Sequence, residues 1–291
     1  MKLELRGVSK RFGKVVALHP LDLTLPAGAR VALIGPNGSG KTTLIRALLG
    51  LVGHGGQVHV DGAPLDRAML APRLGYVPQI APQLAATCGE LVRTVADLRG
   101  VAVTEIAELT EQLDLHLATV AARPFRTLSG GSKQKLLIAL AMAARPDLLI
   151  LDEPTASLDA DARSRFFQLH RDRASGATLI LCSHRLEEIR TLVDHVVALE
   201  DGRLSYDGPA GDYLARRVGT LVELQVASDP TGWLSANGFT AGGNGWWRRG
   251  VDRAAKVELV PAAARALGPD LLDLVVRDVD LVELQREVGH A

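Results

Sequence analysis

The sequence predicts an α/β fold in which a mainly parallel sheet is flanked by helices, followed by a small α+β unit. Three observations support this prediction. Residues 31–34 form a short apolar run typical of a buried strand, and a glycine-rich loop and a helical pattern follow it. Residues 148–151 and 178–182 are further apolar runs, and segments with helical spacing lie between the three runs. Such alternation produces parallel sheets that bind ligands at the carboxyl ends of their strands.

The composition is that of an ordinary globular protein, with 47% hydrophobic and 23% charged residues among 291. Lys and Arg number 33, as do Asp and Glu, so we expect no nucleic-acid partner. Two cysteines, Cys88 and Cys182, make no disulfide framework, which is typical of a reducing cytosol. The N-terminus alternates like a strand and does not resemble a signal peptide. The longest apolar run, 136–144, is far shorter than the ~20 residues of a membrane span, so we expect no membrane crossing.

The glycine-rich loop fits the phosphate-binding pattern G-x-x-x-x-G-K-[ST] at every fixed position. It reads Gly35-Pro36-Asn37-Gly38-Ser39-Gly40-Lys41-Thr42, and Thr43 begins the predicted helix. Its backbone N–H groups and the helix N-terminus would together hold phosphate oxygens. Lys41 would reach the β- and γ-phosphates, and the Thr42 hydroxyl would bind Mg²⁺. The alternative is a glycine-rich turn that binds nothing.

The residues around this loop are predicted to be rich in strands. Before it we expect strands at 2–5, 15–18, 21–25 and 30–34, with turns at 11–13 and 26–28. Phe12 lies in the first turn, where its ring would either stack on a nucleobase or pack on the sheet edge. After the helix, the chain breaks at 50–56, and strands are expected at 57–60 and at 74–77, the latter followed by Pro78 and Gln79.

Residues 80–146 are predicted to be mostly helical, with helices at 90–99, at 104–113 with Thr104 as N-cap, and at 132–144. The apolar strand at 148–151 then runs directly into Asp152 and Glu153. Four apolar residues followed by two acids are a second sign of nucleotide binding. Asp152 would lie on the Mg²⁺ side of the phosphates, and Glu153 would face the attacking water.

The segment Leu128-Ser129-Gly130-Gly131-Ser132 resembles the LSGGQ signature of ABC transporter ATPases. The order of the phosphate loop, Gln79, this signature, Asp152-Glu153, the turn 156–159 and His184 is also that of the family. Residues 1–215 therefore resemble an ABC nucleotide-binding domain. The resemblance implies a P-loop NTPase with a mainly parallel core sheet, an antiparallel β subdomain and a helical subdomain at about 80–146. It also implies ATP and Mg²⁺ as cofactors.

The resemblance further implies a head-to-tail homodimer in the ATP-bound state, in which the signature of each chain completes the site of the other. Ser129 and the backbone of Gly130 and Gly131 would form a second anion cradle, aimed at the partner's γ-phosphate. The alternative is a plain serine N-cap. Ser132 replaces the usual Gln, from which we expect altered dimer contacts and retained activity. Asp159 resembles the residue that links the two sites across the dimer.

The catalytic residues implied by the resemblance follow the two buried strands. Glu153 would be the general base that polarises the attacking water, and Asp152 would hold Mg²⁺ through water. Gln79 would meet both the metal and the attacking water, or else be an exposed loop amide. His184 would bridge the γ-phosphate and Glu153, or else be a hydrogen-bonded structural histidine at a strand end.

From about residue 220 a second pattern begins. We expect strands at 221–226, 256–260 and 271–276, helices at 231–237, 261–267 and 279–288, and a strand or loop at 246–249. This small α+β unit, 220–291, resembles the accessory C-terminal domain of bacterial exporter-type ABC ATPases and would regulate or brace the dimer. The run Trp246-Trp247-Arg248-Arg249 is either a partner-binding patch or a packed hairpin with two exposed basic residues.

Taken together, these patterns predict the cytoplasmic ATP-hydrolysing subunit of an ABC transporter, an exporter. Such a subunit lies on the inner face of the cell membrane through a separate transmembrane permease, which selects the substrate. The alternative is a soluble ABC ATPase that acts on ribosomes or DNA. Those relatives usually carry two nucleotide domains or long insertions, whereas this chain has one phosphate loop and one signature.

Overall fold

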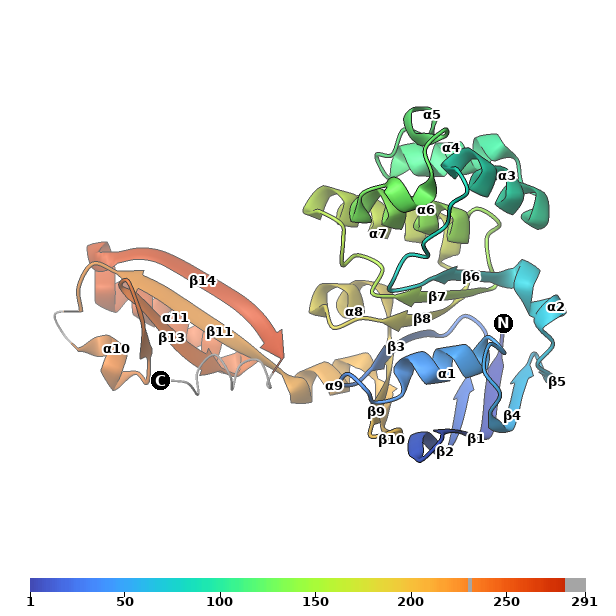
Figure 1. Ribbon diagram of the computed structural model, residues 1–291. Coiled ribbons are helices and arrows are strands. Elements are labelled where there is room, and N and C mark those ends of the chain that lie inside the picture. Colours follow the sequence, from blue (N-terminus) through green and yellow to red (C-terminus); the bar gives the residue numbers. More distant parts are fainter. Residues whose placement is uncertain (230–231, 281–291) are drawn as a thin grey trace. The chain divides into compact units, whose positions relative to one another are not determined.

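The computed structural model describes residues 1–229 and 232–280. The chain divides into two compact units, Met1–Ala210 and Gly211–Ala291. The first unit contains two sheets and most of the helices, and the second contains one sheet (Figure 1). Among the described residues, none of the helices combines the length and the apolar character that a membrane span requires.

The central sheet of the first unit has six strands in the order β10-β9-β3-β8-β7-β6. Neighbouring strands from β9 to β6 run parallel, and β10 pairs antiparallel with β9 at the edge. These strands are β3 (Arg30–Ile34), β6 (Leu74–Val77), β7 (Leu148–Asp152), β8 (Thr178–Cys182), β9 (His195–Glu200) and β10 (Arg203–Pro209). Every residue of β7 and β8 is buried, as their continuous apolar sequences predict. The predicted parallel α/β core is confirmed.

The second sheet is antiparallel, in the order β2-β1-β4-β5. Its strands are β1 (Leu3–Phe12), β2 (Val15–Leu25), β4 (Gly55–Val60) and β5 (Ala63–Pro64). The prediction of separate strands at 15–18 and 21–25 is wrong, because β2 continues through Pro20. The register with β1 shifts between Val8 and Lys10, and such an irregularity accommodates a proline that has no N–H to donate. β1 likewise extends to Phe12, so the turn begins two residues later than expected.

Helices pack on both sides of the central sheet. α1 lies between the two sheets, and its buried residues join both in one core (Figure 1). The helices of this unit are α1 (Lys41–Leu48), α2 (Arg67–Leu70), α3 (Cys88–Arg99), α4 (Val103–Gln112), α5 (Leu117–Val120), α6 (Gly130–Met142), α7 (Ala160–Ala174) and α8 (Leu186–Leu192), with 3₁₀ turns η1 (Ala71–Arg73) and η2 (Phe125–Thr127). α9 (Ala210–Arg217) begins at the last residue of the first unit and continues in the second.

The predicted helices between 80 and 146 are present, but their starts differ from the sequence expectation. α3 begins at Cys88 because Thr87 and Glu90 form a capping box, with the Thr87 hydroxyl accepting from the Glu90 N–H. Thr104 is not the N-cap of α4. Ala102 occupies that position without a side-chain hydrogen bond, so the helix begins where the backbone turns. Ser129, at the start of α6, is a true N-cap.

The second unit contains an antiparallel sheet in the order β12-β13-β11-β14, with α11 packed on β11. Its elements are β11 (Val218–Val226), α10 (Trp233–Ala236), β12 (Thr240–Gly243), β13 (Trp246–Val251), α11 (Arg253–Leu267), the 3₁₀ turn η3 (Gly268–Asp270) and β14 (Leu271–Asp280). Residues 246–249 lie within the β12–β13 hairpin: Trp247 packs against the core, and the Arg248 guanidinium pairs with Glu223 at 2.9 Å. The run is therefore a packed hairpin, but its two arginines are half-buried and not exposed as that alternative expected.

Two element predictions in the second unit are wrong. The segment 256–260 is helical and not a strand, because Asp252 caps α11 and Leu259, Ala263 and Leu267 are buried at helical spacing. Pro261 lies inside this helix and does not begin it. Of the helix expected at 279–288, residues 279 and 280 belong to β14, where Gly219 pairs with Val279. The remainder lies outside the described residues.

Candidate nucleotide site

A cavity of about 680 Å³ lies at the carboxyl ends of β3, β7 and β8. The position follows from the topology, because the parallel strands deliver the residues after them to one edge of the sheet. The lining is Ala17, Leu33, Ile34, Gly35, Pro36, Asn37, Gly38, Ser39, Gly40, Lys41, Thr42, Thr43, Gln79, Asp152, Glu153, Ala156, Ser183 and His184. The structure thus gathers the whole phosphate-loop pattern, both acids, Gln79 and His184 around one space.

The loop between β3 and α1 is shaped for an anion. Gly40 precedes the helix with φ of 102°, and a Cβ there would lie 2.6 Å from the carbonyl oxygen of Ala17. Lys41 Nζ donates to the carbonyl oxygens of Gly35 at 2.6 Å and Pro36 at 3.1 Å. The Ser39 hydroxyl is buried and has no hydrogen-bond partner among the described residues. The loop therefore offers an unused polar group and a lysine that is held only by the loop's own carbonyls.

The two acids at the end of β7 have different surroundings. Asp152 is the last residue of the strand and is 7% exposed. Burial raises the pKa of Asp152, the neighbouring Glu153 raises it further, and the charges of Lys41 and Arg46 lower it. A buried carboxylate with a raised pKa gains from a nearby cation. Together with the Thr42 hydroxyl and the Gln79 amide, Asp152 supplies the hard oxygen atoms that Mg²⁺ prefers.

These oxygen atoms suit a magnesium ion that completes its shell with phosphate and water. The described residues contain no group of three or more His, Cys, Asp and Glu side chains arranged to hold a metal ion. Mg²⁺ is usually bound through one or two carboxylates together with substrate phosphates, and the residues present fit that mode.

Glu153 and His184 form a pair at the edge of the cavity. His184 Nδ1 lies 2.9 Å from Glu153 Oε1, and the histidine side chain is 76% exposed, against 16% for the glutamate. The other carboxylate oxygen, Glu153 Oε2, is buried with no hydrogen-bond partner among the described residues. Glu153 has φ of 50°, in the left-handed region, and its N–H donates to the Cys182 carbonyl at 2.8 Å. The backbone of Glu153 thus adopts an unusual conformation, which places its carboxylate at the cavity.

Phe12 does not line the cavity. Its ring is 48% exposed at the end of β1, and the Lys10 ammonium lies 4.9 Å from the ring centroid. That contact is a cation–π interaction at the surface. The structure therefore presents Phe12 as an exposed ring near a cation, which leaves base stacking as a prediction.

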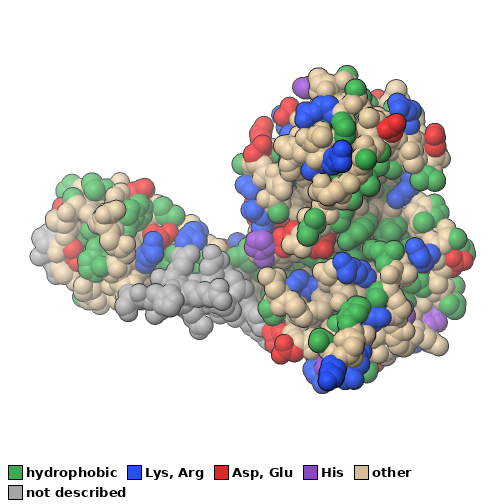
Figure 2. All heavy atoms as spheres, viewed as in Figure 1, with side chains coloured by type: hydrophobic (Ala, Val, Ile, Leu, Met, Phe, Trp, Pro, Cys, Tyr) green, Lys and Arg blue, Asp and Glu red, His purple; other side chains and the backbone are tan. Residues whose placement is uncertain are grey.

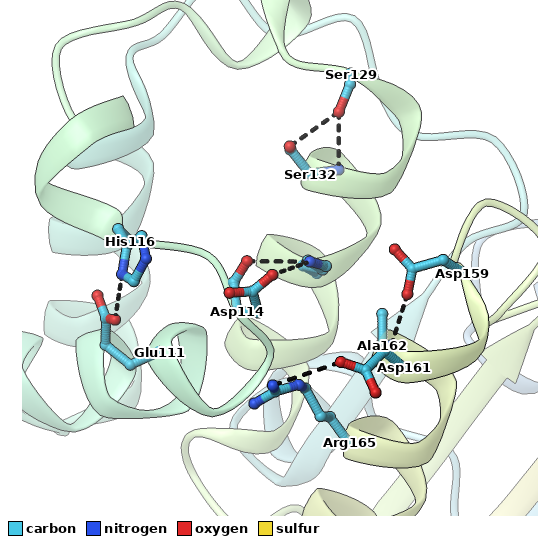
Figure 3. Close-up of polar contacts among 10 residues, drawn as sticks. Glu111, Asp114, His116, Ser129, Ser132, Asp159, Asp161, Ala162 and Arg165 are labelled. Carbon is cyan, nitrogen blue, oxygen red and sulfur yellow. Dashed lines mark hydrogen bonds and ion pairs between the residues drawn. The ribbon is translucent and has the colours of Figure 1, made fainter.

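The signature segment lies away from the cavity of its own chain. Ser129 caps α6: its hydroxyl accepts from the Ser132 N–H at 3.2 Å and donates to the Ser132 hydroxyl at 2.9 Å (Figure 3). Ser129 and Gly130 are exposed. Asp159, also exposed, caps α7 by accepting from the Ala162 N–H at 2.8 Å, and this hydrogen bond lowers the pKa of its carboxyl (Figure 3). Ser129 and Asp159 are thus exposed, and each caps its own helix.

Two residues near the site escaped prediction from the sequence. Ala17 lines the cavity from β2. The residues around it form no recognisable motif, because its carbonyl comes close to the phosphate loop only in the tertiary structure. Glu188 is 1% exposed in α8 and accepts a hydrogen bond from Thr155. An acidic residue in the first turn of a helix is normally predicted to be an exposed charge that stabilises the helix, so the sequence gives no sign that Glu188 is buried.

Comparisons with known proteins agree with this geometry. The ABC transporter family profile matches residues 18–156. The nickel import ATP-binding protein NikO of Rhodobacter capsulatus is 37% identical over 237 residues, covering 73% of this chain and 91% of that protein. The Nod factor export ATP-binding protein I of Cupriavidus pinatubonensis is 35% identical, covering 78% and 72%. The structure of a bacterial Atm1-family ABC exporter with ATP bound matches with a TM-score of 0.67 at 28% identity, covering 74% and 40% of the two chains.

Proposed function

This chain belongs to the ATP-binding subunits of ABC transporters, and on that premise we propose that it hydrolyses Mg²⁺-bound ATP as a head-to-tail homodimer that drives export. As a member of that family it is an ATPase that powers transport and works with a separate transmembrane subunit. The proposal adds the metal, the residue roles, the symmetry of the dimer and the direction.

The observation that carries the proposal is the gathering of Lys41, Asp152, Glu153 and His184 around one cavity with the phosphate loop. Lys41 would exchange its two carbonyl contacts for the β- and γ-phosphates, which are stronger partners for an ammonium. Asp152, Thr42 and Gln79 would hold Mg²⁺, which neutralises charge on the phosphates. These contacts would hold the phosphates where the backbone N–H groups of the loop can stabilise their negative charge.

Glu153 would accept the proton of the attacking water. His184 holds one carboxylate oxygen at 2.9 Å, so the other oxygen has a fixed direction. A base that is positioned in this way needs no reorganisation when the water attacks. The exposed imidazole of His184 would itself reach the γ-phosphate from the solvent side of the pair.

The dimer is proposed because the signature of the chain lies outside its own cavity. Ser129 and Gly130 are exposed at the start of α6, and Asp159 is exposed at the start of α7. A helix N-terminus with an exposed serine and glycines beside it would be an anion cradle that takes its anion from elsewhere. A second copy would supply it, and two-fold symmetry would give both copies a complete site.

Export and peripheral attachment to the membrane are the finer parts of the proposal. The relatives named above include an import protein and an export protein, so the direction rests on the resemblance of the second unit to an exporter accessory domain. Attachment to the inner face of the membrane would come from the transmembrane subunit. On the face drawn in Figure 2, basic and acidic side chains are interspersed, which supports a protein partner over nucleic acid.

The test of the base is Glu153→Gln. We expect hydrolysis to fall by about 10² to 10⁴-fold, the usual contribution of a general base, while ATP still binds and an ATP-bound dimer accumulates. Single-turnover hydrolysis, fluorescent-nucleotide binding and light scattering measure the three quantities. Glu187→Gln, at an exposed carboxylate, is the matched control. Normal turnover in Glu153→Gln would remove Glu153 from the mechanism.

The test of the partner uses the same variant as bait with ATP in detergent-solubilised native cells. Recovery of a polytopic membrane protein supports the transporter, and the partner's sequence then indicates substrate and direction. A Lys41→Ala bait, which should fail to hold ATP, identifies partners that need the ATP-bound dimer. Recovery of ribosomes or nucleic acid without a membrane protein would favour the soluble alternative.

A further inference from the structure

We propose that Glu188 is a positioning residue for the Glu153–His184 pair. It joins the segment that follows β7, which contains Glu153, to the segment that follows β8, which contains His184. This inference rests on the proposed role of Glu153 as general base. Glu188 lies in the first turn of α8, four residues after His184, and it does not itself line the cavity. Its action would therefore be indirect.

The contacts of Glu188 join the ends of two strands. The Thr155 hydroxyl donates to Glu188 Oε1, and Thr155 follows Glu153 by two residues after β7. Both side chains are buried, with 0% of Thr155 and 1% of Glu188 exposed. Glu188 itself lies four residues after His184, at the start of the helix that follows β8. One carboxylate thus connects the segment of the base to the segment of the histidine.

Glu153 needs such support because of its backbone. Its φ of 50° is a conformation that residues other than glycine rarely adopt, and it persists only where the surroundings hold it. On one side the Glu153 N–H is bound to the Cys182 carbonyl at 2.8 Å. On the other side the chain turns, with the Leu158 N–H bound to the Thr155 carbonyl at 3.0 Å. The Thr155–Glu188 hydrogen bond anchors that turn to α8.

Burying a carboxyl group destabilises the folded protein unless hydrogen bonds or nearby charges replace its lost hydration. Burial raises the pKa of Glu188, while the hydrogen bonds from Thr155 and Ser183 lower it. Arg185 Nε lies 3.9 Å from Glu188 Oε1, and Glu188 Oε2 has no hydrogen-bond partner among the described residues. An apolar side chain would fill the same space without this desolvation. The carboxyl group is thus explained by the hydrogen bond that ties α8 to the segment after Glu153.

The experiment compares variants that remove or keep the hydrogen bond. Glu188→Leu and Thr155→Val remove it, whereas Glu188→Gln and Thr155→Ser keep an acceptor or a donor. We expect the first pair to lower kcat by about 10²-fold, the effect of a small misplacement of a catalytic group, with the KM for ATP changed less than about twofold. The conservative pair should restore most of kcat. Glu187→Leu, at the exposed neighbour, should leave kcat unchanged.

A double-mutant cycle tells positioning from a general loss of stability. Because both residues act through one hydrogen bond, kcat of Glu188→Leu/Thr155→Val should equal that of the worse single variant. Multiplied losses, an unchanged kcat, or a parallel rise of KM would overturn the inference. If Glu188→Leu fails to fold, the comparison of kcat between Thr155→Val and Thr155→Ser is sufficient to test the inference. Full turnover in Glu153→Gln would overturn the proposed base, whereas inactive Glu153→Gln with active Thr155→Val would overturn only the role of Glu188.

Discussion

His170 makes the stability of the first unit depend on pH. It lies in α7 and is 3% exposed, and its Nε2 atom has no hydrogen-bond partner among the described residues. Burial, helped by the charges of Arg30 and Arg171, lowers the pKa of His170 from 6.5 to about 4. The folded protein therefore binds this proton more weakly than the unfolded chain does. The contribution of neutral His170 is complete above pH 6.5 and is lost as the pH falls from 6.5 to 4.

The size of the effect follows from the two pKa values. At 1.36 kcal/mol for each pKa unit, the full shift corresponds to about 3 kcal/mol. About 2 kcal/mol of this is lost between pH 7.5 and pH 5, because most of the unfolded chain is protonated at pH 5 while most of the folded state is not. In His170→Leu the free energy of unfolding should fall by about 2 kcal/mol less than in the parent over that interval.

Urea unfolding at pH 7.5, 6.5 and 5.0, followed by circular dichroism, measures this difference. Tryptophan fluorescence is unsuitable, because Trp233, Trp246 and Trp247 all lie in the second unit. Ser164→Ala, at an exposed position of α7, is the control and should keep the parent's pH dependence. If His170→Leu loses as much stability as the parent between pH 7.5 and 5, a neutral buried His170 is refuted.

Three further predictions concern the signature and the cysteines. In Gly130→Ala the new Cβ would lie 3.5 Å from the Ser157 hydroxyl, an ordinary contact, so the melting temperature should hold while hydrolysis falls at least about tenfold, measured as phosphate release. Unchanged hydrolysis would argue against a phosphate at this backbone. Ser132→Ala removes the hydroxyl that receives the Ser129 proton and should change hydrolysis less than about threefold, since the N-cap hydrogen bond remains. Burial raises the pKa of Cys182 far above its usual range, so iodoacetamide at pH 8 should leave it unmodified until urea unfolds the chain, as mass spectrometry would show.

Local patterns were sufficient to predict much of the central sheet. The runs that became β3, β7 and β8 are apolar throughout, and strands that are buried on both faces need such sequences. The phosphate loop is equally local, because all of its residues are covalent neighbours. Residues that directly follow such strands reach the same sheet edge, which is how the acids and His184 meet one cavity.

Errors arose where one pattern suited two structures. Residues 256–260 alternate like a strand, yet the Asp252 cap and burial at 259, 263 and 267 make them part of α11. Short alternating segments fit either element, and only the packing against β11 selects the helix. β2 continues through Pro20 for a related reason, since its pairing with β1 shifts there and no N–H is required.

The sequence by itself determined the parallel α/β core and the resemblance on which the site residues were chosen, because both depend on neighbouring residues in the chain. Only the tertiary structure placed Phe12 outside the cavity and the signature away from its own phosphate loop. The tertiary structure also showed that Glu188 is buried and bonded to Thr155, which lies 33 positions earlier in the sequence. Such contacts join elements distant in sequence, and burial of a carboxyl group depends on everything that surrounds it, which no local pattern records.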